Sequence, residues 1–237
     1  HVSTTSGLVF ALDALANVWH SQALLGENDK ERTRLSQTMC AVIEAFYEDV
    51  EEPVIIDKGR GWPIPTIMQA MSQVIGEKPK IIATVRSIPD CMASFVRVAK
   101  PDDLDEFIYS GVLSTHLKAA YISLQTGYEF APECFCLVEY DDLIADPKSQ
   151  LDRIHAFLEL DDFEYNFEAI DGTSVQEDDE EIHGYEGMHD IQPVLAKQHN
   201  EDPKDVLKHH YATFCQPEFW LDKPRTTPEL HDLDLQL

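Results

Sequence analysis

The chain has 237 residues, 43% of them hydrophobic, and its 18 basic and 44 acidic side chains give a formal net charge of −26. This length and apolar content suit one large globular domain, and no stretch reaches the ~20 apolar residues of a membrane span. So negative a surface repels nucleic acids and anionic membranes, and we expect neither as a partner. The five cysteines are an odd number without zinc-knuckle spacing, so we expect reduced thiols and a cytoplasmic protein.

Short apolar strands alternate with helical patterns along the chain. The strands are expected at Pro53–Asp57, Lys80–Val85 and Cys134–Glu139. The helices are expected at residues 8–25, 31–50, 64–75, 90–99, 103–126, 147–159 and 203–214. Buried strands separated by helices pair in parallel, so the pattern predicts an α/β fold in which helices flank a mostly parallel sheet in three layers. We expect one domain over 1–237, with a mobile acidic loop at about 171–200 and an extended arm at about 221–237.

Cations follow the first predicted strand in the segment Asp57-Lys58-Gly59-Arg60-Gly61. Glycines allow the backbone to approach a ligand, and ligands of parallel sheets bind beyond the carboxyl ends of the strands. We therefore expect Lys58 and Arg60 to line such a crevice. The alternative is a solvated loop with incidental charge.

The second predicted strand ends in Arg86, then turns through Pro89 into a helix that carries Ser94. A guanidinium offers a planar fork of donors, and the start of a helix presents unpaired N–H groups. The hydroxyl of Ser94, eight residues after Arg86, is placed to contact the same anion. This pattern predicts a phosphate site that converges with Lys58 and Arg60, although an Arg at a strand end is often only a surface residue.

Tyr140 follows the third predicted strand, where an aromatic ring can line the same crevice. Three motifs, each preceded by a predicted strand, follow one another along the chain. A strand precedes Lys-x-x-x-x-Pro, and another precedes Arg-x-x-Pro with the Ser eight residues after that Arg. A third precedes Tyr-x-Asp-Leu-x-x-x-Pro and a helix ending in Phe-Leu-x-Leu. Over about residues 1–160 this order resembles the sulfotransferase family, and the segment Gly184–Ile191 is similar to the C-terminal loop of phage and marine bacterial members.

The resemblance implies a P-loop-like nucleotide-binding fold and transfer of a sulfuryl group from 3′-phosphoadenosine-5′-phosphosulfate, with 3′,5′-ADP as product and no metal. It implies that Arg86 and Ser94 bind the 3′-phosphate, that Lys58 contacts the sulfuryl group or bridging oxygen, and that Tyr140 lies near the donor. Arg60 stands where cytosolic members carry a His base. Because Arg cannot abstract a proton, we assign it to donor binding. The acceptor is a hydroxyl or amine of a small molecule or glycan, and the oligomeric state is not indicated.

Three residues compete for the role of catalytic base. His116 lies five residues after Gly111, a spacing that resembles a substrate-contacting His of cytosolic members, and its alternative is an ordinary histidine on a helix face. Asp57 is expected to be the ion-pair partner of Lys58 instead, and His1 stands at the first position. The remaining histidine-rich segments fit no standard metal-ligand spacing, so no metal site is expected (His183, His189, His199, His209 and His210).

The family's 5′-phosphosulfate loop is the main departure. The nearest candidate, Val2–Gly7, has no cation and no predicted strand before it, so we expect this loop to be absent and the amino-terminal part of the domain to be truncated. Activity of the chain is therefore left open. The alternatives are a P-loop kinase-like phosphotransferase, although the Gly-x-x-x-x-Gly-Lys-Ser/Thr pattern is missing, and a non-catalytic binding or scaffold protein of the same fold.

Overall fold

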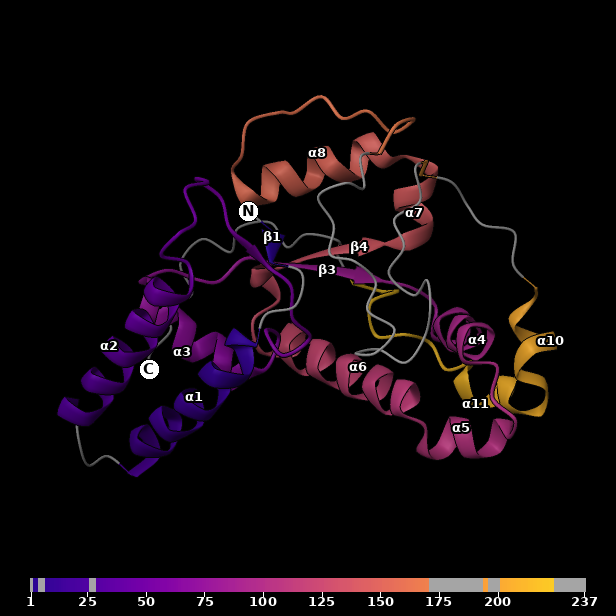
Figure 1. Ribbon diagram of the computed structural model, residues 1–237, viewed down its shortest axis with the longest axis horizontal. Coiled ribbons are helices and arrows are strands. Elements are labelled where there is room, and N and C mark those ends of the chain that lie inside the picture. Colours follow the sequence, from indigo (N-terminus) through magenta and orange to yellow (C-terminus); the bar gives the residue numbers. More distant parts are fainter. Residues whose placement is uncertain (1, 4–6, 26–28, 171–193, 196–200, 224–237) are drawn as a thin grey trace. The chain divides into compact units, whose positions relative to one another are not determined.

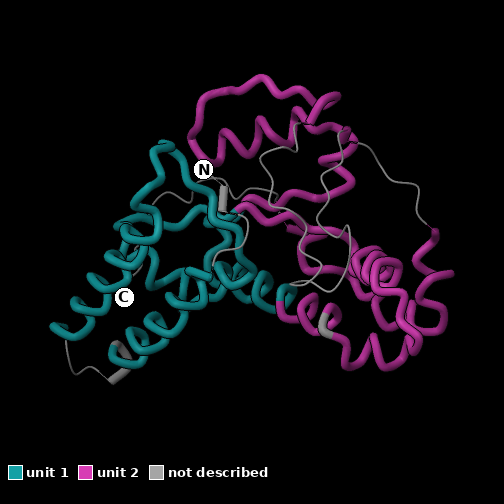
Figure 2. The backbone as a smooth tube through the Cα atoms, in the orientation of Figure 1, with its two compact units in different colours: residues 1–81, 120–135, 228–237 teal, residues 82–119, 136–227 magenta. Residues whose placement is uncertain are grey.

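The computed structural model describes residues 2–3, 7–25, 29–170, 194–195 and 201–223. The chain divides into two compact units (Figure 2). Unit 1 comprises residues 1–81, 120–135 and 228–237, and unit 2 comprises residues 82–119 and 136–227. Each unit is described by itself below, and the single domain expected over 1–237 stays a prediction.

Unit 1 contains a short parallel sheet and a helical layer. Its strands are β1 (Val2–Ser3) and β2 (Ile56–Asp57), with Val2 opposite Ile56 and Ser3 opposite Asp57. Its helices are α1 (Leu8–Leu25), α2 (Asp29–Phe46) and α3 (Pro65–Ile75), followed later in the chain by the 3₁₀ turn η1 (Pro132–Cys134). The strand β1 lies within the segment Val2–Gly7 and was not predicted.

The core of unit 1 forms where α1, α2 and α3 pack together (Figure 1). Along α1 the buried residues Leu8, Leu12, Ala16 and Trp19 recur every three or four positions, which places them on one face of the helix. Met39 of α2 and two residues of α3 complete the cluster. Each fully buried aliphatic side chain contributes about 1.5–3 kcal/mol relative to exposure, so this face fixes the helix that follows β1.

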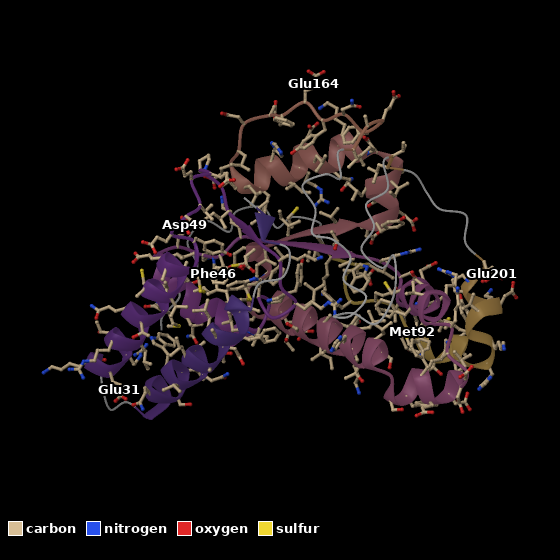
Figure 3. The ribbon with its side chains drawn as sticks, in the orientation of Figure 1. Glu31, Phe46, Asp49, Met92, Glu164 and Glu201 are labelled. Atoms are coloured by element: carbon tan, nitrogen blue, oxygen red, sulfur yellow. The ribbon has the colours of Figure 1, made fainter. Side chains whose placement is uncertain are left out.

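Unit 2 is built around the second pair of strands, β3 (Ile81–Val85) and β4 (Phe135–Glu139), which form a two-stranded sheet and run in the same direction in Figure 1. The helices are α4 (Ile88–Ala99), α5 (Leu104–Ser110), α7 (Tyr140–Ala145), α8 (Pro147–Leu158), α10 (Pro203–Leu207) and α11 (Tyr211–Phe214), with the 3₁₀ turn η2 (Lys208–His210) between the last two. Met92 of α4 is fully buried in a cluster with Phe107, Ile108 and Leu207 (Figure 3). This cluster fixes α4, the helix that follows Arg86.

The helix expected over 103–126 is two helices, α5 and α6 (Val112–Phe130), separated at Gly111. Gly111 has an extended backbone (φ −64°, ψ 147°), and its N–H donates to the Phe107 carbonyl. A Cβ atom on Gly111 would lie 2.3 Å from that carbonyl oxygen, so the close approach at the break requires glycine. Helix α7, between β4 and α8, was not predicted.

The α/β class is confirmed. β1, which pairs in parallel with β2, was not predicted. The described strands pair as two separate two-stranded sheets, and the three-layer arrangement stays a prediction. Most of the expected acidic loop at 171–200 and of the arm at 221–237 lies outside the described residues. Acidic side chains such as Asp49, Glu164 and Glu201 are exposed (Figure 3), and no helix among the described residues is long and apolar enough to cross a membrane.

Candidate functional site

Arg86 and Tyr140 meet where the two strands of unit 2 end. Arg86 directly follows β3 and Tyr140 directly follows β4, so parallel strands place both residues at the same edge of the sheet. The Arg86 guanidinium carbon lies 4.5 Å from the centroid of the Tyr140 ring. A guanidinium on an aromatic face is held in orientation by about 0.5–2 kcal/mol. The predicted pair is therefore brought together, with the Arg86 fork partly exposed (28%) to receive an anion.

Helix α4 begins two residues after Arg86. Its first residue, Ile88, donates its backbone N–H to the Glu218 carboxylate at 3.0 Å, because Ser87 at the N-cap position supplies no side-chain cap. The guanidinium of Arg86 also lies 3.9 Å from the Asp90 carboxylate. Carboxylates thus already stand at the positive end of this helix, where its free N–H groups favour negative charge.

Ser94 and Arg97 share the face of α4 that continues from Asp90, at spacings of four and three residues. The Ser94 hydroxyl is half-buried and has no hydrogen-bond partner among the described residues. In the same part of the chain, Nη1 of Arg97 is buried and also lacks a partner. A buried guanidinium N–H without an acceptor is costly, so this face suits an anionic ligand. The sequence motifs did not point to Arg97.

Cys91 lies beside this site on α4. Burial raises the pKa of its thiol to about 11, and the positive charge of Arg86 only partly opposes this effect. Its Sγ lies 3.8 Å from the Arg86 carbonyl oxygen, as a weak donor. The neutral thiol therefore supports the backbone of the strand end.

Lys58 and Arg60 lie on a loop of unit 1 that follows β2, and neighbouring residues contact the backbone of this loop. Both side chains are exposed and make no ion pair within the described residues. Ser123 donates its hydroxyl to the Arg60 carbonyl at 3.2 Å. A Cβ on Gly61 would lie 3.0 Å from Val9 of α1, so the loop backbone packs closely on that helix. These contacts hold the loop backbone in place, whereas the side chains of Lys58 and Arg60 are exposed to solvent.

Asp57 anchors the start of this loop through two aromatic donors. The Tyr47 hydroxyl donates a hydrogen bond to Oδ2, and the Trp62 indole N–H donates to Oδ1 at 2.9 Å. The expected Asp57–Lys58 ion pair is therefore wrong: the carboxylate oxygens face Tyr47 and Trp62. The sequence did not predict these two hydrogen-bond partners of Asp57. No local pattern indicates that Tyr47, the residue after α2, contacts the end of β2.

Replacing Asp57 with asparagine lowers the free energy of unfolding by about 1–3 kcal/mol, because the amide offers one acceptor oxygen to two partly buried donors. Urea denaturation of Asp57→Asn measures the loss, and Asp49→Asn, which removes the same charge at an exposed position, is the control. Equal stability of the two variants would show that the Tyr47–Asp57–Trp62 network does not hold the loop.

The structure gives little support to the candidate bases His116 and His1. His116 is exposed on α6 and contacts no described residue through a hydrogen bond or ion pair. It belongs to unit 2, whereas Lys58 and Arg60 belong to unit 1. His1 lies outside the described residues. The convergence of Lys58, Arg60 and Arg86 on one crevice, and the role of His116, stay predictions.

Comparison with known proteins identifies the family. The family model described as "Sulfotransferase family" matches residues 27–165, which include Lys58, Arg60, Arg86, Ser94, His116 and Tyr140. No curated protein matches the chain. Among solved structures, the "Sulfotransferase Domain from the Curacin Biosynthetic Pathway" is 20% identical with a TM-score of 0.38, and the match covers 67% of this chain and 56% of that one. Because the family model matches more than half of the 237 residues, the chain belongs to the sulfotransferase family.

Proposed function

We propose that this protein transfers a sulfuryl group from 3′-phosphoadenosine-5′-phosphosulfate to a hydroxyl or amine of a small molecule or glycan. One observation carries the proposal: the Arg86 guanidinium lies over the ring of Tyr140, close to the start of α4. Ser94 and the unpartnered Nη1 of Arg97 extend the same donor set along the helix. Two guanidinium groups and a hydroxyl fit a dianionic phosphate, and we assign them to the 3′-phosphate.

Lys58 is assigned to the reacting end of the donor. During transfer the bond between sulfur and the oxygen shared with the 5′-phosphate breaks, and a new bond forms between sulfur and the acceptor oxygen or nitrogen. The ammonium of Lys58 stabilises the negative charge that grows on the bridging oxygen, and Arg60 adds a second cation. A base takes the acceptor proton, and His116 is our candidate for it.

In place of the expectation that the 5′-phosphosulfate loop is absent, we propose that this loop lies between β1 and α1, and the pairing of β1 with β2 supports this proposal. Ser3 lies opposite Asp57 in parallel strands, so the end of β1 lies at the same edge of the sheet as Lys58. Four residues separate the end of this strand from the start of the 18-residue helix α1. A strand, a short hydroxyl-rich segment and a helix N-terminus form a suitable phosphate cradle. Thr4, Thr5 and Ser6 lie outside the described residues, and we assign them to this role from their sequence.

Sulfuryl transfer is tested directly by incubating the protein with the sulfate donor and a panel of phenols, alcohols, amines and glycans, and by following 3′,5′-ADP release together with the mass of the acceptor. We expect equal amounts of 3′,5′-ADP and sulfated acceptor. Phosphorylated acceptor formed from ATP and Mg²⁺ in the parallel reaction would favour the kinase-like alternative and contradict the proposal.

Removing the charge of Glu218 should strengthen product binding. Its carboxylate accepts from the first N–H of α4, close to the phosphate site that we assign to Arg86 and Ser94. Glu218→Gln keeps the shape and removes a negative charge near a dianion, so we expect about 3- to 10-fold tighter binding of 3′,5′-ADP. Calorimetric titration measures the affinity, with the exposed Glu201→Gln as control. Weaker binding in Glu218→Gln would mean that Glu218 supports the ligand site.

A further inference from the structure

A second cluster of chemically active side chains lies in unit 2, where η2 contacts α5. Asp105 stands in the first turn of α5, and His209 and His210 are the last two residues of η2. His210 Nε2 lies 2.6 Å from Asp105 Oδ1, and His209 Nε2 lies 3.4 Å from the same oxygen. Each residue contributes one donor atom, and all three lie within 4.8 Å of one another. None of them belongs to the residues assigned to the sulfate donor.

His210 alone would satisfy the Asp105 carboxylate with a hydrogen bond, so the presence of His209 at the same oxygen needs a separate explanation. His210 is 3% exposed, and Tyr109 packs edge-on against its ring at 5.5 Å between centroids. His209 is different, because its side chain is 70% exposed and yet its Nε2 turns back to the same carboxylate oxygen. The two imidazole rings lie 3.9 Å apart, so the pair presents two nitrogens to one oxygen.

The backbone before the two histidines adopts a conformation that non-glycine residues rarely show. Lys208 has φ 52° and ψ −126°. Such a conformation costs about 1–3 kcal/mol for a residue with a Cβ, and it persists where surrounding contacts compensate for it. Here it begins the turn that directs both imidazoles to Asp105.

We propose that Asp105, His209 and His210 bind a divalent transition-metal ion of the Zn²⁺ type. Two imidazole nitrogens and a carboxylate oxygen are ligands that Zn²⁺ accepts, with water at the fourth position. Ligand atoms about 2.0–2.2 Å from a tetrahedral ion lie roughly 3.3–3.5 Å apart, which is the present His209–Asp105 separation. The shorter His210–Asp105 hydrogen bond opens by less than an ångström or so, and its Nε2 proton moves to Nδ1 or to solvent.

The metal would join the carboxyl-terminal segment of unit 2 to α5. Asp105 and the two histidines are more than 100 positions apart in the sequence, so an ion between them cross-links distant parts of the chain. An ion that binds only the folded protein raises its stability by mass action, and the net charge of −26 favours cations near the surface. We assign this site a structural role, because none of its three residues belongs to those assigned to sulfuryl transfer.

Zinc chloride titration of the chelator-stripped full chain tests this site by calorimetry and thermal unfolding. We expect one ion per chain and a rise in the unfolding midpoint. Asp105→Asn and His209→Gln should each weaken binding at least 10-fold and abolish most of the rise. Their unfolding without metal serves as the folding check, and because both side chains are exposed we expect His209→Gln to unfold near the unmodified midpoint.

Matched controls are Asp102→Asn, an exposed carboxylate three residues from Asp105, and His20→Gln in unit 1, and both should bind zinc like the unmodified chain. Absence of zinc binding by the unmodified chain would overturn the proposal. Zinc binding that is unchanged in Asp105→Asn and His209→Gln would also overturn it, because the ion would then lie at other residues.

Discussion

Replacing Arg86 with glutamine lowers the affinity for 3′,5′-ADP by about 100-fold, equivalent to about 2.7 kcal/mol. The guanidinium lies over Tyr140 and is only partly exposed, so its donors are already oriented before a ligand arrives. A glutamine amide is shorter and uncharged, and it cannot provide the fork of charge-assisted hydrogen bonds to a phosphate. Isothermal titration calorimetry of the Arg86→Gln variant measures the change.

The loss should be confined to the ligand that carries a 3′-phosphate. Binding of 5′-AMP, which lacks that group, should change by less than about 3-fold. The control is Arg34→Gln, which removes the same charge from an exposed position of α2. If Arg86→Gln weakened 5′-AMP and 3′,5′-ADP equally, Arg86 would not be the residue that contacts the 3′-phosphate.

Replacing Lys58 with methionine lowers kcat by about 100- to 1,000-fold and leaves the affinity for 3′,5′-ADP nearly unchanged. The ammonium acts on charge that develops only as the sulfur–oxygen bond breaks, so its removal raises the barrier without removing ground-state contacts. Lys58 is exposed and has no ion-pair partner among the described residues, so the variant should keep the stability of the unmodified chain. The rate of 3′,5′-ADP release with the best acceptor of the panel gives kcat.

Lys30→Met is the matched control for this variant, because Lys30 is an exposed lysine of α2 and its loss changes the net charge equally. We expect it to react at the unmodified rate. A Lys58→Met variant that loses product affinity but keeps its kcat would place Lys58 in ground-state binding instead of catalysis.

The sequence predicted the features that depend on local pattern. The apolar runs before Arg86 and Tyr140 marked two strands, of which β4 is largely buried and β3 mostly half-buried, and parallel pairing placed the residues after them at one edge. The limits of α1 follow from its periodic apolar positions. Gly111 also carried a usable signal, since a glycine inside a long helical pattern weakens that pattern, yet the helix over 103–126 was predicted as continuous.

Features that depend on pairing between distant segments were not predictable in this way. β1 has two residues, too few for any alternation, and it exists as a strand only because β2 lies beside it. The Asp57 carboxylate was expected to face its sequence neighbour, but tertiary packing brings Tyr47 and Trp62 to it instead. A search for metal-ligand spacing missed His209 and His210 because their third partner, Asp105, is contributed by another helix.

Recognition of the 3′-phosphate by the unmodified chain is the most direct test of the proposed function. Calorimetric titrations with 3′,5′-ADP, with 5′-AMP and with ATP plus Mg²⁺ measure it under one set of conditions. We predict that 3′,5′-ADP binds at least 100-fold more tightly than 5′-AMP, through Arg86, Ser94 and Arg97, and more tightly than ATP with Mg²⁺. Equal affinities for 3′,5′-ADP and 5′-AMP, or tighter binding of ATP with Mg²⁺, would contradict it.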